Sequence, residues 1–187
     1  MNNIKSIFDE HLDVANRSKV SLINEIEDAC NVIKNSLLNG NKILLFGNGG
    51  SAGDAQHIAA EFTGRFLHER SALPAIALTT DTSAITAIGN DYGFDKIFQR
   101  QVEALAVKGD VLIGISTSGN SQNVINGFEA GKVKGCPTIA FTGRDGGRIS
   151  KSCDLNLIVP SNTTARIQEI HILLGHIICE YVDNFFK

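Results

Sequence analysis

The stretch KILLFGNGGS at residues 42–51 decides the fold, because an apolar run leads directly into a loop of glycine and serine. A second stretch, VLIGISTSGNS at residues 111–121, repeats this arrangement with more hydroxyl groups. Each loop precedes a helix-like segment, so backbone N–H groups of the loop and of the first helical turn can converge on an anion. Two such loops, one rich in hydroxyls, predict a ligand that is phosphorylated and polyhydroxylated, and a sugar phosphate fits best.

Short apolar runs alternate with helical segments along the core of the chain. Strands are predicted at 42–47, 75–79, 110–116, 137–142 and 155–159, and helices at 51–64, 82–90, 94–107 and 121–134, with a short turn near 146–152. Continuously apolar strands separated by helices indicate a parallel sheet that is covered on both faces. The predicted fold class is a doubly wound α/β sandwich, with ligands at the carboxyl ends of its strands.

Helical segments flank this core on both sides. Residues 1–39 read as two helices ended by Asn39-Gly40, an extension packed on the main domain or on another subunit. The last helix, from about Thr163 to Phe185, is apolar over most of its girth. We therefore expect it at a subunit interface, with a central helix inside a monomer as the alternative. The chain is predicted to be one domain, 1–187, with a helical extension at 1–40 and the α/β core and last helix at 41–187.

The bulk composition fits an ordinary globular domain, with 43% hydrophobic and 20% charged residues. A net charge of -3 argues against a general nucleic-acid binder. The four scattered cysteines form no CxxC pair and are expected to be reduced, mostly buried thiols. The N-terminus lacks the apolar core of a signal peptide, and no apolar run approaches the ~20 residues that span a bilayer. These features predict a cytoplasmic protein with no membrane or nucleic-acid partner.

The glycine spacing excludes the common nucleotide loops. Gly47-x-Gly49-Gly50 is not a dinucleotide fingerprint, and no lysine follows it as in a P-loop, so no nucleotide cofactor is expected. The second loop places four hydroxyls beside a helix N-terminus, where they can contact phosphate oxygens together: Ser116, Thr117, Ser118 and Ser121. The alternative is that they are solvated, with Ser121 or Asn120 only capping the helix.

Two helices carry candidate acid, base or metal-binding side chains. His57 and Glu61 stand four residues apart and share a helical face, which suits metal binding, proton transfer or a simple surface contact. The last helix carries Gln168, His171 and His176 among apolar residues, and these polar groups need partners. Gln168 and His176 differ by roughly 80° in direction and ~12 Å in rise. Since zinc bonds are only ~2 Å long, joint ligation would need long converging side chains, a distortion of the helix or a neighbouring subunit, and we favour a site at a subunit boundary.

Taken together, these residues resemble a known family. The run GNGGSAGDAQH at 47–57, continuing to Glu61-Phe62-Thr63-Gly64-Arg65, is similar to the signature of the sedoheptulose-7-phosphate isomerases, or phosphoheptose isomerases, of the sugar isomerase (SIS) domain family. The match continues in order through Asn90-Asp91-Tyr92-Gly93, the loop at 116–121, and Arg166-Ile167-Gln168-Glu169 to His176. It covers essentially the whole chain.

The resemblance implies a five-stranded parallel, flavodoxin-like sandwich assembled as a homotetramer with active sites at subunit boundaries. It implies interconversion of D-sedoheptulose 7-phosphate and D-glycero-D-manno-heptose 7-phosphate through an enediolate. This reaction is the first step toward the nucleotide-activated heptoses of bacterial lipopolysaccharide or capsule. One zinc per subunit is also implied.

The same resemblance assigns a role to each matching residue. The implied phosphate-binding residues are Ser116, Thr117, Ser118 and Ser121, with Ser51 close by. The implied contacts to the sugar come from Asn48, Gly49, Gly50, Asn90 and Asp91, and Glu61 and Gln168 are also implied to bind the substrate. Glu61 and His176 are the implied acid/base pair, and Arg65 is a supporting residue. The implied zinc ligands are His57, Glu61, Gln168 and His176. Zinc binding and the role of base compete at Glu61, because a metal-bound carboxylate is a weaker base.

Two other functions share this fold. One is a non-catalytic SIS tetramer that regulates replication initiation through protein contacts, and the other is a sugar-phosphate-sensing domain. The second is disfavoured because no DNA-binding segment is attached to the domain. Simultaneous retention of Glu61, Gln168 and His176 favours the enzyme, since an interaction module has no chemical need for them.

Overall fold

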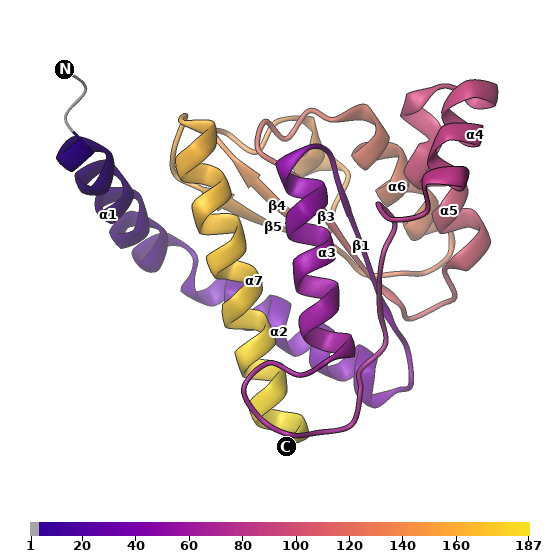
Figure 1. Cartoon of the computed structure of the whole chain (residues 1–187), viewed down its shortest axis with the longest axis horizontal. Coiled ribbons are helices and arrows are strands. Elements are labelled where there is room, and N and C mark those ends of the chain that lie inside the picture. The colour runs from indigo at the N-terminus through magenta and orange to yellow at the C-terminus, as the bar shows by residue number, and fades with distance from the viewer. Residues whose placement is uncertain (1–3) are drawn as a thin grey trace.

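The computed structural model describes residues 4–187, which form a five-stranded sheet with helices on both faces (Figure 1). The strands are β1 (Ile43–Gly47), β2 (Ala75–Ala77), β3 (Val111–Ser116), β4 (Thr138–Gly143) and β5 (Leu155–Val159). The helices are α1 (Ile4–Ser21), α2 (Ile23–Leu38), α3 (Gly50–Thr63), α4 (Thr82–Tyr92), α5 (Ile97–Leu105), α6 (Gln122–Val133) and α7 (Thr164–Phe186). Two short 3-10 turns, η1 (Phe94–Lys96) and η2 (Arg148–Lys151), complete the elements.

All strand pairs in the sheet are parallel, in the order β2-β1-β3-β4-β5. The chain turns from one direction of winding to the other between β1 and β3, where Gly47 pairs with Ile115. In open α/β sheets, such a switch point forms a crevice at the carboxyl ends of the strands. The predicted α/β sandwich is confirmed, and both glycine-containing loops lie at this crevice.

Two apolar cores lie on opposite faces of the sheet. The larger core joins β-strand side chains to α2, α3 and α7, and the smaller one joins them to α5, α6 and part of α4. Figure 1 shows α3 and α7 side by side on one face, with α4, α5 and α6 on the other. All four cysteines are free thiols, and only Cys153 is not fully buried, as expected from the sequence.

Element boundaries agree with the sequence-based prediction to within a few residues, with one difference in kind. The helix predicted at 94–107 is divided into η1 and α5. Gly93, which precedes η1, has a left-handed backbone conformation with φ 85°. The N-terminal extension forms two helices as predicted, although its residues 1–3 lie outside the described part. Within residues 4–187, no helix has the length and apolar character needed to cross a membrane.

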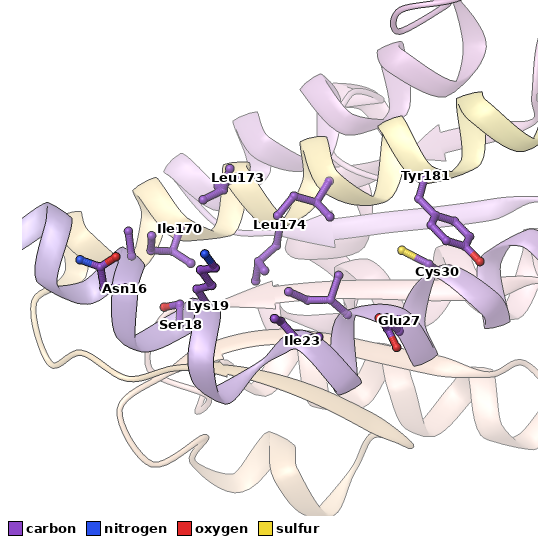
Figure 2. Close-up of a pocket in the computed structure, with 13 residues that line it drawn as sticks. Asn16, Ser18, Lys19, Ile23, Glu27, Cys30, Ile170, Leu173, Leu174 and Tyr181 are labelled. Atoms are coloured by element: carbon purple, nitrogen blue, oxygen red, sulfur yellow. The ribbon is translucent and has the colours of Figure 1, made fainter.

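The helices α1 and α7 leave a large apolar surface uncovered in the single chain. In Figure 1, α1 projects away from the sheet, and its residues Ile4, Phe8 and Leu12 are more than half exposed. On α7, one side is fully buried, but Leu173, Ile177, Tyr181 and Phe185 form an exposed stripe at intervals of four residues. A groove of about 540 Å³ lies between this part of α7 and the α1–α2 pair, as Figure 2 shows.

Candidate active site

The two glycine-containing loops are joined by a pair of asparagines. Asn48, which follows β1, and Asn123, in the first turn of α6, exchange hydrogen bonds of 2.9 and 2.8 Å through their side-chain amides. Asn123 is 2% exposed, so its amide would be left without water if this pair were broken. The pair therefore fixes the first loop against the helix that begins in the second loop.

The hydroxyl-rich loop forms a small cradle at the N-terminus of α6. The Oγ atoms of Ser116 and Ser121 lie 2.9 Å apart, and Ser118 Oγ accepts the N–H of Asn120. Ser121 occupies the N-cap position of α6 but makes no side-chain capping bond. Its hydroxyl is therefore directed to Ser116 instead of to the helix, which disfavours a role for Ser121 in capping alone.

A neighbouring loop holds this cradle in shape from outside. Gly119 has φ 64°, and a Cβ atom there would lie 2.1 Å from the carbonyl oxygen of Gly146. Ile149 donates its N–H to Gly119 O, and Arg148 donates to Asn120 O from its guanidinium. This close backbone approach leaves no space for a side chain at position 119.

The first loop gathers the remaining residues assigned to the substrate by sequence. Gly49, the N-cap residue of α3, has φ 57°, and Ser51 is 4% exposed in the first turn. Gln168 of α7 reaches this turn, since a Cβ atom built on Gly50 would lie 2.7 Å from its Nε2. The end of the Gln168 side chain thus lies at the mouth of the loop, and a side chain at position 50 would displace it.

Further along the same two helices lies a second cluster of site residues. His57 Nε2 lies 3.2 Å from Glu61 Oε1 and 3.3 Å from Nε2 of His176 on α7. The ring of Phe66, from the segment after α3, lies 5.5 Å from the ring of His176. The structure therefore brings His57, Glu61 and His176 together within one chain, which the sequence had left open.

This cluster is well separated from the loops of the same chain. Glu61 follows Gly50 by eleven residues, a rise of ~16 Å along α3. The C-terminal end of α3 lies near the amino end of β1, opposite to the loops. Phe62 O accepts the N–H of Leu73, and Pro74 O accepts the N–H of Ile43, the first residue of β1. Within one chain, the predicted phosphate loop and the predicted acid/base pair occupy opposite ends of α3.

Four of the predicted residues stand apart from the acid/base cluster. Gln168 lies at Gly50 as described above, two helical turns before His176. Asn90 and Asp91 lie exposed near the end of α4, on the other face of the sheet from α3, where Asn90 Nδ2 donates to Asp91 Oδ1. Arg65 is exposed and is paired with Glu69 at 3.7 Å.

The donors predicted for zinc are only partly assembled in one chain. Two ligands of a tetrahedral zinc ion, each ~2.0–2.1 Å from the metal, lie ~3.3 Å apart, a separation close to the 3.3 Å between the Nε2 atoms of His57 and His176. However, no three His, Cys, Asp or Glu side chains within the part of the chain that the structure describes converge on a common point for a metal. Together with the position of Gln168, this makes the donor set of a single chain incomplete.

Three buried polar residues were not singled out by the sequence as partners of the site. Asn123 carries no signal apart from its place after the second loop, and the buried pair Arg70 and Asp183 has none, because its members are 113 residues apart. His171, which the sequence left between a structural and a site role, is buried and contacts Thr142 O through Nε2 at 3.0 Å. Burial lowers the pKa of His171 to about 4, partly opposed by this bond, so His171 is a neutral core residue.

Comparison with known proteins agrees with this geometry. A model described as "SIS domain" matches residues 8–143. A phosphoheptose isomerase from Aquifex aeolicus is 56% identical over 98% of this chain and 96% of its own, and one from Aliarcobacter butzleri is 65% identical over 85% and 84%. The solved structure of a phosphoheptose isomerase from Neisseria gonorrhoeae superposes with a TM-score of 0.92 at 49% identity, covering 97% of both chains. The chain therefore belongs to the phosphoheptose isomerase family of SIS-domain proteins.

Proposed function

We propose that this protein is an aldose–ketose isomerase that interconverts D-sedoheptulose 7-phosphate and D-glycero-D-manno-heptose 7-phosphate. The observation that carries the proposal is the close approach of His57 on α3 to both Glu61 of the same helix and His176 of α7. Relatives named phosphoheptose isomerase cover nearly the whole chain, which supports the same reaction here and its place at the start of heptose activation for surface polysaccharide. A purely protein-binding SIS regulator has no use for this cluster, so that alternative is not favoured.

The chemistry requires proton transfer between C1 and C2 through an enediolate. A base must reach both carbons, a second group must move the proton at the oxygens, and the developing negative charge must be stabilised. We assign the carbon proton to the Glu61 carboxylate and the oxygen proton to His176. His57 Nε2 lies 3.2 Å from the Glu61 carboxylate and 3.3 Å from the His176 ring nitrogen, so it links the two side chains.

We further propose that the complete site is shared between subunits of a homotetramer. An extended seven-carbon chain with its phosphate ester reaches roughly 10 Å, given bonds of ~1.5 Å. The ~16 Å rise from Gly50 to Glu61 exceeds that reach, which supports a site made from the loops of one subunit and the Glu61–His176 pair of another. The exposed apolar stripe on α7 and the groove beside α1 and α2 supply a surface for such assembly.

Zinc remains part of the proposal as a resident metal held by His57, Glu61, Gln168 and His176. The incomplete donor set of one chain supports completion by a neighbouring subunit, as proposed for the substrate. When bound, zinc would polarise the substrate carbonyl. Metal analysis of the purified oligomer, before and after dialysis against a chelator, tests the stoichiometry of one zinc per subunit. No nucleotide cofactor is proposed, and the cytoplasmic location stays a prediction that cell fractionation can test.

The function is tested by incubating the purified protein with sedoheptulose 7-phosphate and following the aldose by NMR, with and without chelator. The wild-type protein is expected to form the heptose 7-phosphate, and Glu61→Gln is expected to lose about 10²–10⁴-fold in kcat. Absence of product under both conditions would favour a regulatory protein. Full turnover by a folded Glu61→Gln variant would show that the assigned base is wrong.

A further inference from the structure

A buried ion pair lies at the end of α3 and α7 that carries the acid/base cluster. Arg70 Nε donates to Asp183 Oδ1 at 2.6 Å, and the two side chains are 1% and 0% exposed. Arg70 belongs to the segment between α3 and β2, and Asp183 lies seven residues after His176 on α7. Neither residue carries chemistry that the proposed reaction uses.

The guanidinium of Arg70 closes the last turn of α3. It donates to Glu61 O at 2.9 Å and to Phe62 O at 3.0 Å, two carbonyl groups at the end of the helix that have no helical partner. A planar guanidinium can hold these carbonyls and the Asp183 carboxylate at the same time. The backbone of Glu61 is thereby tied to α7.

The Asp183 carboxylate holds the segment that follows α3. Its Oδ2 accepts the N–H groups of Leu67 and His68 at 2.8 and 2.6 Å. Burial acts to raise the pKa of Asp183, but these N–H groups and the Arg70 guanidinium hold it below its ordinary value, so Asp183 stays charged. The next residue back along this segment is Phe66, whose ring packs against His176.

From these contacts we propose that Arg70 and Asp183 are positioning residues that set the Glu61 carboxylate and the His176 ring in place around His57. One side of the pair fixes the backbone of Glu61, and the other fixes the segment that places Phe66 on His176. This inference rests on the proposed function of Glu61 and His176. Neither member of the pair contacts the hydroxyl-rich loop, so the pair acts on proton transfer and not on phosphate binding.

The same end of α3 carries a second arginine, which makes a useful contrast. Arg65, assigned as a supporting residue from the sequence, is exposed and only 3.7 Å from Glu69, itself 90% exposed. Such surface pairs contribute little to stability or geometry. The contacts that tie the Glu61 backbone come from Arg70, five residues further along the chain, and the supporting role of Arg65 stays a prediction.

The test compares kcat and KM for sedoheptulose 7-phosphate in Arg70→Lys and wild type. Lysine retains the buried positive charge beside Asp183 but cannot span to Glu61 O and Phe62 O together. Because small displacements of reacting groups reduce turnover steeply, we expect kcat to fall about 10–100-fold with KM within about twofold. Phe66→Leu, which removes no buried charge, is expected to lower kcat about threefold and keeps the test decisive if Arg70→Lys does not fold.

The matched control is an ion pair whose carboxylate is also buried. Lys42 and Asp110 are joined at the amino ends of β1 and β3, and the Asp110 side chain is fully buried. Asp110→Asn should lower the melting temperature but leave kcat of the folded enzyme within about twofold, because the Asp110 carboxylate bonds to Asn41, Lys42 and Val107 and not to a residue of the proposed site.

Three outcomes separate the possibilities. A loss of kcat in Arg70→Lys or Phe66→Leu, without a similar loss in Asp110→Asn, supports positioning. Unchanged kcat in folded variants, or an equal loss in the control, overturns it and leaves the Arg70–Asp183 pair a purely structural contact. Absence of turnover by the wild-type protein overturns the proposed function itself, which distinguishes that failure from failure of the positioning role.

Discussion

At its N-terminal end, α3 begins in a loop of neutral groups: glycines, Ser51 and the Asn48 amide that Asn123 holds. At its C-terminal end, the groups that gather are titratable or charged, namely His57, Glu61 and His176, with Arg70 and Asp183 beneath them. Neutral hydrogen-bonding groups can bind a ligand without exchanging protons with it, whereas titratable groups can accept and donate the proton that the reaction transfers. The contrast indicates a division between binding at one end and chemistry at the other.

The largest expected effect is at the titratable end. His176→Asn keeps a side chain that can form hydrogen bonds but removes the ring that takes up and returns a proton. We expect kcat to fall about 10²–10⁴-fold while KM changes little, because phosphate binding lies elsewhere. Steady-state kinetics would contradict the division if the main effect were a rise in KM.

His171, on α7 like His176, is expected to affect the stability of the protein instead of its turnover. The pKa of His171 is lowered to about 4, against an ordinary value of 6.5. Above pH 6.5 both folded and unfolded chains carry it neutral, and as pH falls toward 4 only the unfolded chain takes up the proton. The free energy of unfolding should therefore decrease by about 3 kcal/mol over this range from His171 alone.

Denaturant titrations at pH 7, 5.5 and 4.5 measure this loss. His171→Gln retains a donor for Thr142 O but does not titrate, so its stability should depend less on pH. An equal pH dependence in the two proteins would show that other groups cause the loss.

The binding end is tested by Gly119→Ala. The left-handed φ of 64° and the Gly146 carbonyl at 2.1 Å from the new Cβ force the hydroxyl-rich loop to move. Because hydrogen bonds to a charged group are each worth ~1.5–3 kcal/mol, loss of one or two raises KM by about 10–100-fold. Gly53→Ala in α3 is the control, since nothing lies within 4 Å of its Cβ and alanine favours the helix. Equal KM values for the two variants would count against a phosphate site in this loop.

The smallest effect is expected at the link between the two loops. Asn123→Ala leaves the Asn48 amide without its partner, at a cost of about 1 kcal/mol, and should raise KM about fivefold with kcat nearly unchanged. Kinetics and thermal unfolding of this variant show whether the link serves binding or only stability. A lower melting temperature with unchanged KM would assign it to stability alone.

The fold could be predicted from the sequence because its signals are local. The two central strands that carry the loops are almost entirely apolar runs, and each loop follows its strand directly, as in Ile43–Gly47 and Val111–Ser116. The parallel arrangement and the switch point then follow from general rules of strand connection. The break at Gly93 was predicted, because the helices were expected at 82–90 and 94–107, but the division of 94–107 into η1 and α5 after Lys96 was missed.

The candidate site was predictable only in part. The hydroxyl-rich loop comes from consecutive residues, so the sequence identifies its members. The contact between His57 and His176 joins residues 119 apart, and the Arg70–Asp183 pair joins residues 113 apart, so neither distance follows from spacing. Helical geometry did predict that Gln168 and His176 would not meet at one point. In this chain Gln168 of α7 lies beside Gly50 at the start of α3, and His176 lies beside His57 further along α3.

The most direct test of the shared site mixes a variant impaired in kcat with a variant impaired in KM, at a substrate concentration well below the wild-type KM. Glu61→Gln provides an intact phosphate loop, and Gly119→Ala provides an intact Glu61–His176 pair. If each site uses the loop of one subunit and the acid/base pair of another, random hybrids of equal amounts should regain about one quarter of wild-type sites. Turnover of sedoheptulose 7-phosphate after co-expression, compared with each variant alone, measures this recovery. Hybrid oligomers with no more activity than the separate variants would contradict a site shared between subunits.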